Sequence, residues 1–222
     1  MAEREFAIRL KDVELAGELD LTADAKGLVV FAHGSGSSRK SPRNRQVRQA
    51  LARGGMGTLL FDLLTPEEEQ AEAYTRHLRF NIPFLAGRLI QATRWVLDRG
   101  TTRDINVGFF GASTGAAAAL MAAAELRETV SAVVSRGGRP DLAGDALEIV
   151  TAATLLIVGG DDQPVLSLNE EAYTRLTCEK ALRIIPGATH LFEEAGALEK
   201  VAEMATEWFA THFQPMANRE SS

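Results

Sequence analysis

The chain has 222 residues, very little cysteine and no long apolar run. Cys178 is its only cysteine, which excludes an internal disulfide framework and a metal site built from several cysteines. No apolar stretch approaches the roughly 20 residues that a membrane-spanning helix requires. Residues 1–5 carry charges, and no apolar signal core follows them. We therefore expect a cytoplasmic protein that has no membrane partner.

Positive charge is also scarce. The 24 lysines and arginines are outnumbered by 30 aspartates and glutamates, which gives a formal net charge of -6. Non-specific nucleic-acid binding requires a basic surface, so this balance argues against nucleic acid as a partner. The length suits one sizeable core, and we predict a single domain over residues 1–222 with a flexible tail at 214–222. The sequence leaves a monomer and a small homo-oligomer open.

Apolar runs of strand length alternate with segments of helical spacing, which predicts a largely parallel sheet. The runs that predict buried strands are 27–32, 58–64, 105–110, 130–134, 154–158 and 181–185. Two earlier strands, 6–10 and 13–21, alternate apolar and polar residues as a hairpin would. Helices are predicted at 44–53, 81–99, 166–177 and 195–213. The polar segment 65–79 is interpreted as a surface loop or a mobile lid, and its His77 as an exposed residue.

The most informative stretch is 105–120, where an apolar run passes through a turn of small residues into an alanine-rich run. The turn reads Gly-Ala-Ser-Thr-Gly around Ser113, which matches the G-x-S-x-G pattern of a nucleophile elbow. Glycines at 111 and 115 would avoid collisions with the neighbouring strand and helix. The pattern alone is weak evidence, but a strand before it and a helix after it provide the required setting.

An acidic pair and a histidine follow Ser113, each just after a later predicted strand. The order Ser113, Asp161 or Asp162, His190 is that of α/β-hydrolases. The carboxyl ends of neighbouring parallel strands lie together, so these residues can meet. His190 would take the proton of the Ser113 hydroxyl, and the acid would orient the imidazole. Spacing alone leaves both aspartates as alternatives.

A glycine- and serine-rich loop, 33–38, directly follows one of the buried strands. We predict that the backbone N–H groups of Ser35 and Thr114 bind an oxyanion. Nearby arginines are candidate contacts for an acidic group of the substrate, because their planar guanidinium matches carboxylates and phosphates. They are Arg39, Arg43, Arg136 and Arg139. The alternative for all four is a solvated surface or turn position.

The segments 33–38, 111–115, 159–165 and 187–190 resemble those of the α/β-hydrolase superfamily and, within it, of the small dienelactone hydrolase-like proteins. The resemblance spans about residues 5–213. It implies an α/β-hydrolase fold with a mostly parallel sheet of about seven to eight strands, helices on both faces and no cap domain. It also implies Asp162 as the acid, because Gly159, Asp162 and Val165 fit the family's G-x-x-D-x-x-V frame and Asp161 does not.

The resemblance includes one departure. Dienelactone hydrolases proper carry a cysteine where this chain has Ser113, which argues against dienelactone as the substrate. The segment 135–141 also resembles that of hydrolase domains fused to phosphoribosyltransferase domains in some bacterial proteins. That likeness does not indicate a substrate.

These features predict a serine hydrolase that cleaves carboxylic esters, or related thioesters or lactones, through an acyl-enzyme. A small-molecule ester would be its partner, and the chemistry needs no cofactor or metal. Two alternatives stay open. One is an NADP-binding protein, because Gly108, Gly111 and Gly115 lead from a strand into a helix, although G-x-G-x-x-G is absent. The other is an inactive hydrolase fold that serves as a binding module.

Overall fold

The centre of the fold is an eight-stranded sheet with the order β1-β2-β4-β3-β5-β6-β7-β8. The structure, a computed structural model, describes residues 4–99, 102 and 105–213. Its strands are β1 (Arg4–Arg9), β2 (Glu14–Asp20), β3 (Leu28–Ala32), β4 (Gly57–Phe61), β5 (Val107–Ala112), β6 (Val130–Arg136), β7 (Ala153–Gly159) and β8 (Lys180–Ile185). The pairs β1–β2 and β2–β4 are antiparallel, and the other five are parallel. The predicted mostly parallel sheet and its strand number are confirmed.

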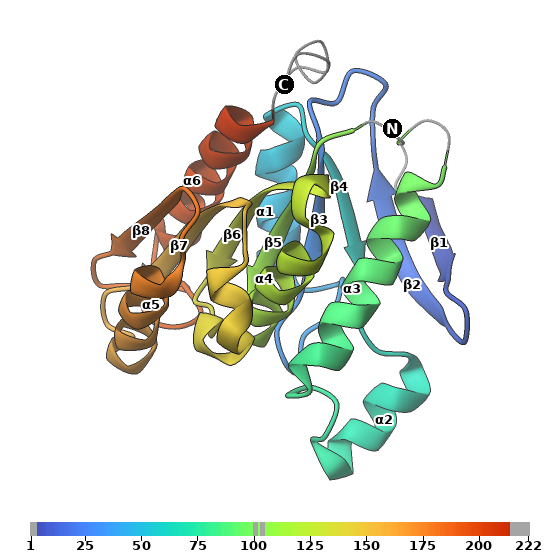
Figure 1. Cartoon of the computed structure of the whole chain (residues 1–222), viewed down its shortest axis with the longest axis horizontal. Helices are drawn as coiled ribbons and strands as arrows, with labels where there is room; N and C mark the ends of the chain where they lie inside the picture. The colour runs from blue at the N-terminus through green and yellow to red at the C-terminus, as the bar shows by residue number, and fades with distance from the viewer. Residues whose placement is uncertain (1–3, 100–101, 103–104, 214–222) are drawn as a thin grey trace.

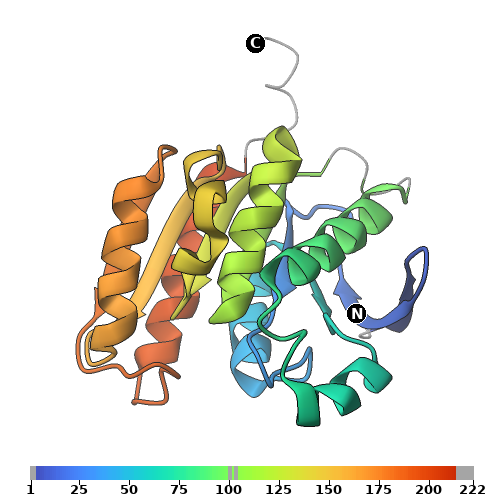
Figure 2. The same cartoon turned by 60° about the horizontal axis from the view of Figure 1, so that its bottom comes forward.

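Helices cover both faces of the sheet (Figure 1). On one face lie α1 (Pro42–Arg53) and α6 (Ala197–His212). On the other lie α3 (Ile82–Leu97), α4 (Thr114–Leu126), the 3₁₀ segment η2 (Pro140–Glu148) and α5 (Gln163–Arg175). A short 3₁₀ turn, η1 (Arg127–Thr129), precedes β6. Figure 2 shows the resulting layers, with α2 (Pro66–Thr75) at their edge.

Each face of the sheet has its own apolar core, and the central strands contribute to both. Val30 and Phe109 pack into the core beneath α3 and α4. Their neighbours Val29 and Phe110 pack into the core beneath α1 and α6. Every residue of β3, β4, β5 and β7 is buried, which explains why these strands appear in the sequence as continuous apolar runs.

The segment 65–79 differs from its prediction as a loop, because most of it forms α2. Thr65 begins the helix with a reciprocal cap: its hydroxyl accepts the Glu68 N–H at 3.2 Å, and the Glu68 carboxylate accepts the Thr65 N–H at 2.8 Å. Thr-x-x-Glu is a sequence signature of such a cap, but no apolar stripe accompanies it here. His77 is exposed as predicted. No cap domain covers the sheet within the described residues.

Two negative findings concern the described residues only. None of their helices combines the length and apolarity needed to cross a membrane. Nor do these residues gather three or more histidine, cysteine, aspartate or glutamate side chains where a metal ion could bind.

Candidate active site

Ser113 occupies a strained turn between β5 and α4. Its backbone has φ 51° and ψ -123°, a conformation that residues other than glycine rarely adopt. The surroundings leave no room for larger neighbours. A Cβ at Gly115 would lie 2.2 Å from the Ala32 carbonyl oxygen, and one at Gly111 would lie 2.4 Å from the Cα of Ala116. The two glycines of the motif are therefore required by close backbone packing, as the sequence predicted.

The carboxyl end of β6 holds this turn in place. The Ser113 N–H donates to the Arg136 carbonyl at 3.3 Å. The Ser113 carbonyl accepts the N–H groups of Ala116 and Arg139, each at 3.1 Å. The turn that follows β6 thus contacts the proposed nucleophile through its main chain.

His190 and Asp162 form a direct pair. The Nδ1 of His190 lies 2.7 Å from Oδ2 of Asp162, so an Nδ1–H donates to the carboxylate and Nε2 is left to accept a proton. Asp162 follows β7 and begins α5, and its side chain is only 13% exposed. Asp161 is exposed. The structure thus pairs with His190 the aspartate that the resemblance implied.

The turn after β6 brings Ser113 and His190 to the same edge of the sheet. Gly137, at φ 50°, follows Arg136. A Cβ on Gly137 would lie 3.1 Å from the His190 carbonyl and 3.6 Å from Nδ1 of His190. Among the described side chains, the Ser113 hydroxyl makes no hydrogen bond. Catalytic hydrogen bonds are often formed only when substrate is bound, so this arrangement is compatible with a triad.

The predicted oxyanion donors contact each other. The Ser35 N–H donates to Oγ1 of Thr114 at 3.1 Å, and the Ser35 hydroxyl donates to the Arg79 carbonyl at 3.1 Å. The two hydroxyl oxygens are 2.9 Å apart. Because the Ser35 hydroxyl already donates its proton to the Arg79 carbonyl, the Thr114 hydroxyl must donate to Ser35 Oγ. The Ser35 N–H is therefore occupied, whereas the Thr114 N–H has no hydrogen-bond partner in the described part of the chain.

His33 has a structural role in the same loop. Its Nδ1 lies 3.0 Å from the Gly34 carbonyl, and its Nε2 accepts the Leu63 N–H at 3.0 Å. Burial lowers the pKa of His33, and the Gly34 carbonyl offsets only part of that effect. A neutral His33 thus joins the loop 33–38 to the chain that leaves β4.

The four candidate arginines have different partners. Arg39 pairs with Asp62 at 2.5 Å, and Arg139 forms a fork with Asp141 at 2.8 and 2.7 Å. Arg43 pairs at 3.1 Å with Glu193, which is 64% exposed. Arg136 is buried, and its Nε and Nη1 have no hydrogen-bond partner among the described residues. Arg39 and Arg139 are thus engaged within the protein, and Arg43 and Arg136 remain the stronger candidates.

A cavity of about 780 Å³ lies beside the loop 33–38. Its lining includes His33, Ser35, Arg39, Arg43 and Asp62. Sequence reasoning missed Asp62 and the Arg79 carbonyl at this place. No local pattern could indicate them, because the Arg79 carbonyl contacts Ser35 of the loop, and Asp62 contacts Arg39 just after it, across segments far apart in the chain.

The sheet order, the turn at Ser113 and the His190–Asp162 pair define the protein as an α/β hydrolase. No protein-family model matches the chain. A dienelactone hydrolase structure from Anabaena variabilis is 55% identical, with a TM-score of 0.94, over 96% of this chain and 99% of that one. The chain belongs to the dienelactone hydrolase-like family of α/β hydrolases.

The chain is also similar to a longer protein and to a more distant esterase. A Mycobacterium tuberculosis protein, whose name proposes a phosphoribosyl transferase, is 54% identical over 212 residues. That match covers 96% of this chain and 47% of the relative, so the chain spans about half the length of the curated relatives it matches. An esterase from Pyrococcus furiosus shares the fold, with a TM-score of 0.76 at 17% identity over 96% of this chain and 92% of that one.

Proposed function

We propose that this α/β hydrolase is a serine esterase that cleaves carboxylic esters, or related thioesters or lactones, through an acyl-enzyme. The observation that carries the proposal is the 2.7 Å contact between His190 and Asp162 at the edge where Ser113 occupies its strained turn. A serine hydroxyl is a poor nucleophile at neutral pH, and an oriented imidazole is the usual means of activating it.

In the proposed mechanism, Oγ of Ser113 attacks the ester carbonyl and its proton passes to Nε2 of His190. Asp162 stabilises the imidazolium through the bond at Nδ1. The tetrahedral intermediate then expels the alcohol, which takes the proton from His190. A water molecule repeats the sequence on the acyl-enzyme and releases the acid. The bonds made and broken balance without a cofactor or a metal.

The oxyanion would be bound by two backbone N–H groups. The Thr114 N–H is available, and the Ser35 N–H becomes available when Thr114 Oγ1 releases it. One such donor contributes about 3–4 kcal/mol of barrier reduction in a well-studied protease. The network of Ser35, Thr114 and Arg79 therefore must rearrange locally during the reaction.

The packing of the glycines weakens the NADP-binding alternative. A Cβ at Gly108 would lie 2.5 Å from the Phe209 ring of α6. Gly111 and Gly115 likewise face backbone within the protein. These glycines are explained by close packing and not by the approach of a pyrophosphate. We also propose that the transferase activity in the mycobacterial name belongs to the part of that protein outside the match.

The names of the relatives support the class. The family member from Anabaena variabilis is called a dienelactone hydrolase, and more distant proteins of the same fold are called esterases. Dienelactone hydrolysis and ester hydrolysis are both acyl transfer to water. A serine at position 113 favours ordinary oxygen esters as substrates, because a Ser–His pair generates an alkoxide equivalent at neutral pH.

The test is hydrolysis of p-nitrophenyl acetate and butyrate by the wild type and by Ser113→Ala, together with intact mass after fluorophosphonate treatment. We expect turnover by the wild type, loss of at least 10³-fold in the variant, and one adduct located on Ser113. The matched control is Ser167→Ala, because Ser167 is exposed on α5 and should leave both readouts unchanged. A well-folded wild type with neither turnover nor adduct would contradict the proposal.

A further inference from the structure

One buried arginine differs from the others in its partners. Among the described residues, three arginines are buried: Arg48, Arg88 and Arg136. Arg48 pairs with Glu18 at 3.3 Å, and Arg88 pairs with Glu68 at 2.6 Å. Arg136 is 8% exposed, and its Nε and Nη1 are buried without a hydrogen-bond partner. Within the described part of the chain, Arg136 is the buried guanidinium that has no counter-ion.

An unpaired buried cation is costly, because the protein interior does not replace the water that solvated it. Burial and the nearby charge of Arg43 lower the pKa of Arg136 to about 10. This value still leaves the guanidinium protonated at neutral pH. A positive charge therefore persists in a place where the chain supplies no negative one.

The main chain places Arg136 next to the proposed catalytic residues. Arg136 ends β6 opposite Ala112 of β5, and its carbonyl accepts the Ser113 N–H. The Cζ of its guanidinium lies 5.9 Å from the centre of the Phe192 ring, two residues after His190. The side chain is thus held between β6 and the loop that carries His190.

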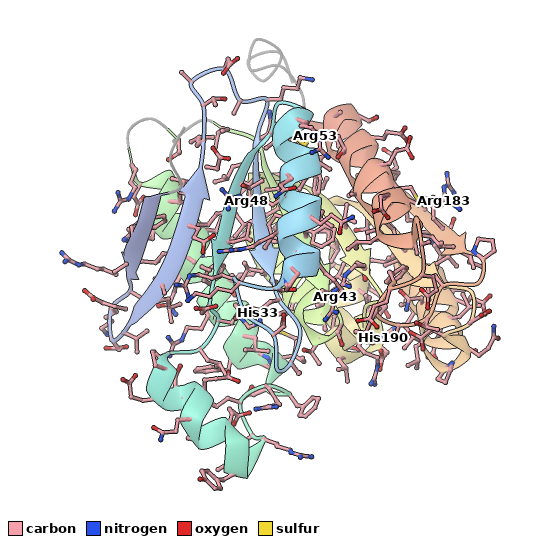
Figure 3. The ribbon with its side chains drawn as sticks, turned by 180° about the vertical axis from the view of Figure 1, so that it is seen from behind. His33, Arg43, Arg48, Arg53, Arg183 and His190 are labelled. Atoms are coloured by element: carbon pink, nitrogen blue, oxygen red, sulfur yellow. The ribbon has the colours of Figure 1, made fainter. Side chains whose placement is uncertain are left out.

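Arg43 brings a second guanidinium to this region from the first turn of α1. Its Nε is buried without a hydrogen-bond partner, and its Nη1 contacts the exposed Glu193. Figure 3 shows Arg43 on the side of α1 that faces His190. Arg43 also lines the cavity beside Ser35. No acidic residue occupies the first turn of α1, where the helix dipole favours an anion.

We propose that Arg136 and Arg43 bind an anionic group, a carboxylate or a phosphate monoester, on the substrate of this hydrolase. A guanidinium offers several N–H donors in one plane and matches either group. A bound anion would use the unpaired Nε and Nη1 of Arg136 and the unpaired Nε of Arg43. The assignment to the substrate rests on the proposed esterase function, whereas anion binding itself rests only on the two arginines.

Anion binding is tested without turnover. The Ser113→Ala protein is titrated calorimetrically with glutarate and, separately, with inorganic phosphate. We expect at least one of them to bind, with affinity about ten- to a hundredfold weaker in Ser113→Ala/Arg136→Met. Arg136→Lys keeps the charge and should retain part of the affinity. The control is Arg53→Met, at the far end of α1 in Figure 3, which should bind as the parent does.

The titrations also identify the anion. Binding of glutarate alone points to a carboxylate, and binding of phosphate alone points to a phosphate monoester. No binding of either anion to the parent protein, or equal binding by the Arg136→Met form, overturns the proposal. Thermal melts establish that each variant is folded, and Arg43→Met provides an independent second test if Arg136→Met does not fold.

The kinetic arm compares two esters of equal length, p-nitrophenyl pentanoate and mono-p-nitrophenyl glutarate, which differ by a terminal carboxylate. If glutarate binds, we expect Arg136→Met to lower the ratio of kcat/KM for the anionic ester to that for the neutral one by tenfold or more. An unchanged ratio in an active enzyme rejects the substrate site but not the esterase. If neither ester is cleaved, the esterase proposal fails, and the titrations still decide whether the arginines bind anions.

Discussion

At the residue scale, the backbone conformation of Ser113 depends on the absence of side chains at Gly111 and Gly115. The turn is strained at φ 51°, and the absent side chains at 111 and 115 allow β3, β5 and α4 to meet around it. Strain of this kind persists only where the surrounding packing is tight enough to hold it. The glycines therefore contribute to the position of the hydroxyl as well as to stability.

Replacing Gly115 should expose this dependence. A Cβ there would meet two backbone carbonyl oxygens within 2.5 Å, so we expect Gly115→Ala to destabilise the fold by about 1–3 kcal/mol and to lower ester turnover more than tenfold. The control is Gly87→Ala in α3, where a Cβ would meet nothing within 4 Å. It should stabilise the protein by about 0.5–1 kcal/mol. Denaturant melts and p-nitrophenyl butyrate assays measure both effects, and an active, stable Gly115→Ala would contradict the argument.

The adjacent aspartates provide a sharp comparison. Asp162→Asn removes the charge that the His190 Nδ1–H contacts at 2.7 Å, and we expect kcat to fall by about 10³–10⁴-fold. Asp161→Asn changes an exposed neighbour and should leave kcat within about twofold, as surface substitutions usually do. Steady-state kinetics on p-nitrophenyl butyrate separates the two. Equal losses in both variants would show that the pair does not orient the imidazole.

The sequence was most informative for residues whose chemistry depends on local spacing. The turn predicts Ser113, and the place after a strand predicts His190. Spacing leaves Asp161 and Asp162 as alternatives, and only the family resemblance favours Asp162. The arginines could not be ranked, because their partners come from other elements: Asp62 for Arg39, for example. Whether a charged side chain is paired depends on the fold, and the local amino-acid sequence does not show it.

At the scale of elements, α2 is tied to the site by one buried carboxylate. Glu72 accepts the N–H groups of Leu78 and Arg79 at 2.7 and 2.9 Å. It also accepts the Thr75 hydroxyl and the Arg79 Nε. Arg79 in turn accepts the Ser35 hydroxyl through its carbonyl. A continuous set of hydrogen bonds thus runs from α2 to the loop 33–38.

These bonds predict a pH dependence. Burial of the Glu72 carboxylate opposes its ionisation, but the N–H groups of Leu78 and Arg79 outweigh it and lower the pKa to about 2. A lowered pKa means that the stabilisation is complete above the ordinary value of 4.5 and is lost as the pH falls toward 2. We expect Glu72→Gln to be less stable than the wild type by a constant margin from pH 5 to about 8, and this margin should shrink below pH 4.5.

Denaturant melts at several pH values measure that margin. The control is Glu67→Gln, an exposed position in the first turn of the same helix, whose smaller effect should reflect only the helix dipole. A margin that does not shrink in acid would mean that the Glu72 charge has no special role. Glu72→Gln should also loosen Arg79, whose carbonyl accepts the Ser35 hydroxyl, and so lower kcat for p-nitrophenyl butyrate several-fold, because the Ser35 N–H is proposed to act only in the transition state.

The difference between strands and α2 shows where prediction from sequence succeeds. Strands buried on both faces need apolar residues at every position, so their sequence is unambiguous. The helix α2 has no apolar face to bury. The only features of its sequence that relate to its structure are a capping signature and one internal glutamate. The position of α2 follows from the hydrogen bonds that Glu72 and Arg79 make. Nothing in the sequence indicates which residues these two contact.

At the scale of the whole molecule, both apolar cores depend on the same strands. Val29 and Val30 are neighbours in β3 and belong to different cores. Neither layer of helices can separate without exposing a face of the shared sheet. We propose that the chain is one domain, and we expect one cooperative unfolding transition with equal calorimetric and van't Hoff enthalpies. Two resolved transitions would contradict a single domain.

The hydrogen bond from Ser35 to Thr114 has a consequence for selectivity within the proposed mechanism. The Thr114 hydroxyl oxygen accepts the Ser35 N–H and therefore competes with any ligand for this donor. A ligand can displace it only if its oxygen is a stronger hydrogen-bond acceptor than a hydroxyl oxygen. An ester carbonyl is a weak competitor, whereas the negatively charged oxygen of the tetrahedral intermediate is a strong one. Transfer of the Ser35 N–H from the Thr114 hydroxyl to the substrate oxygen is therefore favourable only after Ser113 has attacked. The protein's own side chain would thus withhold this donor from the ground state and reserve it for the transition state.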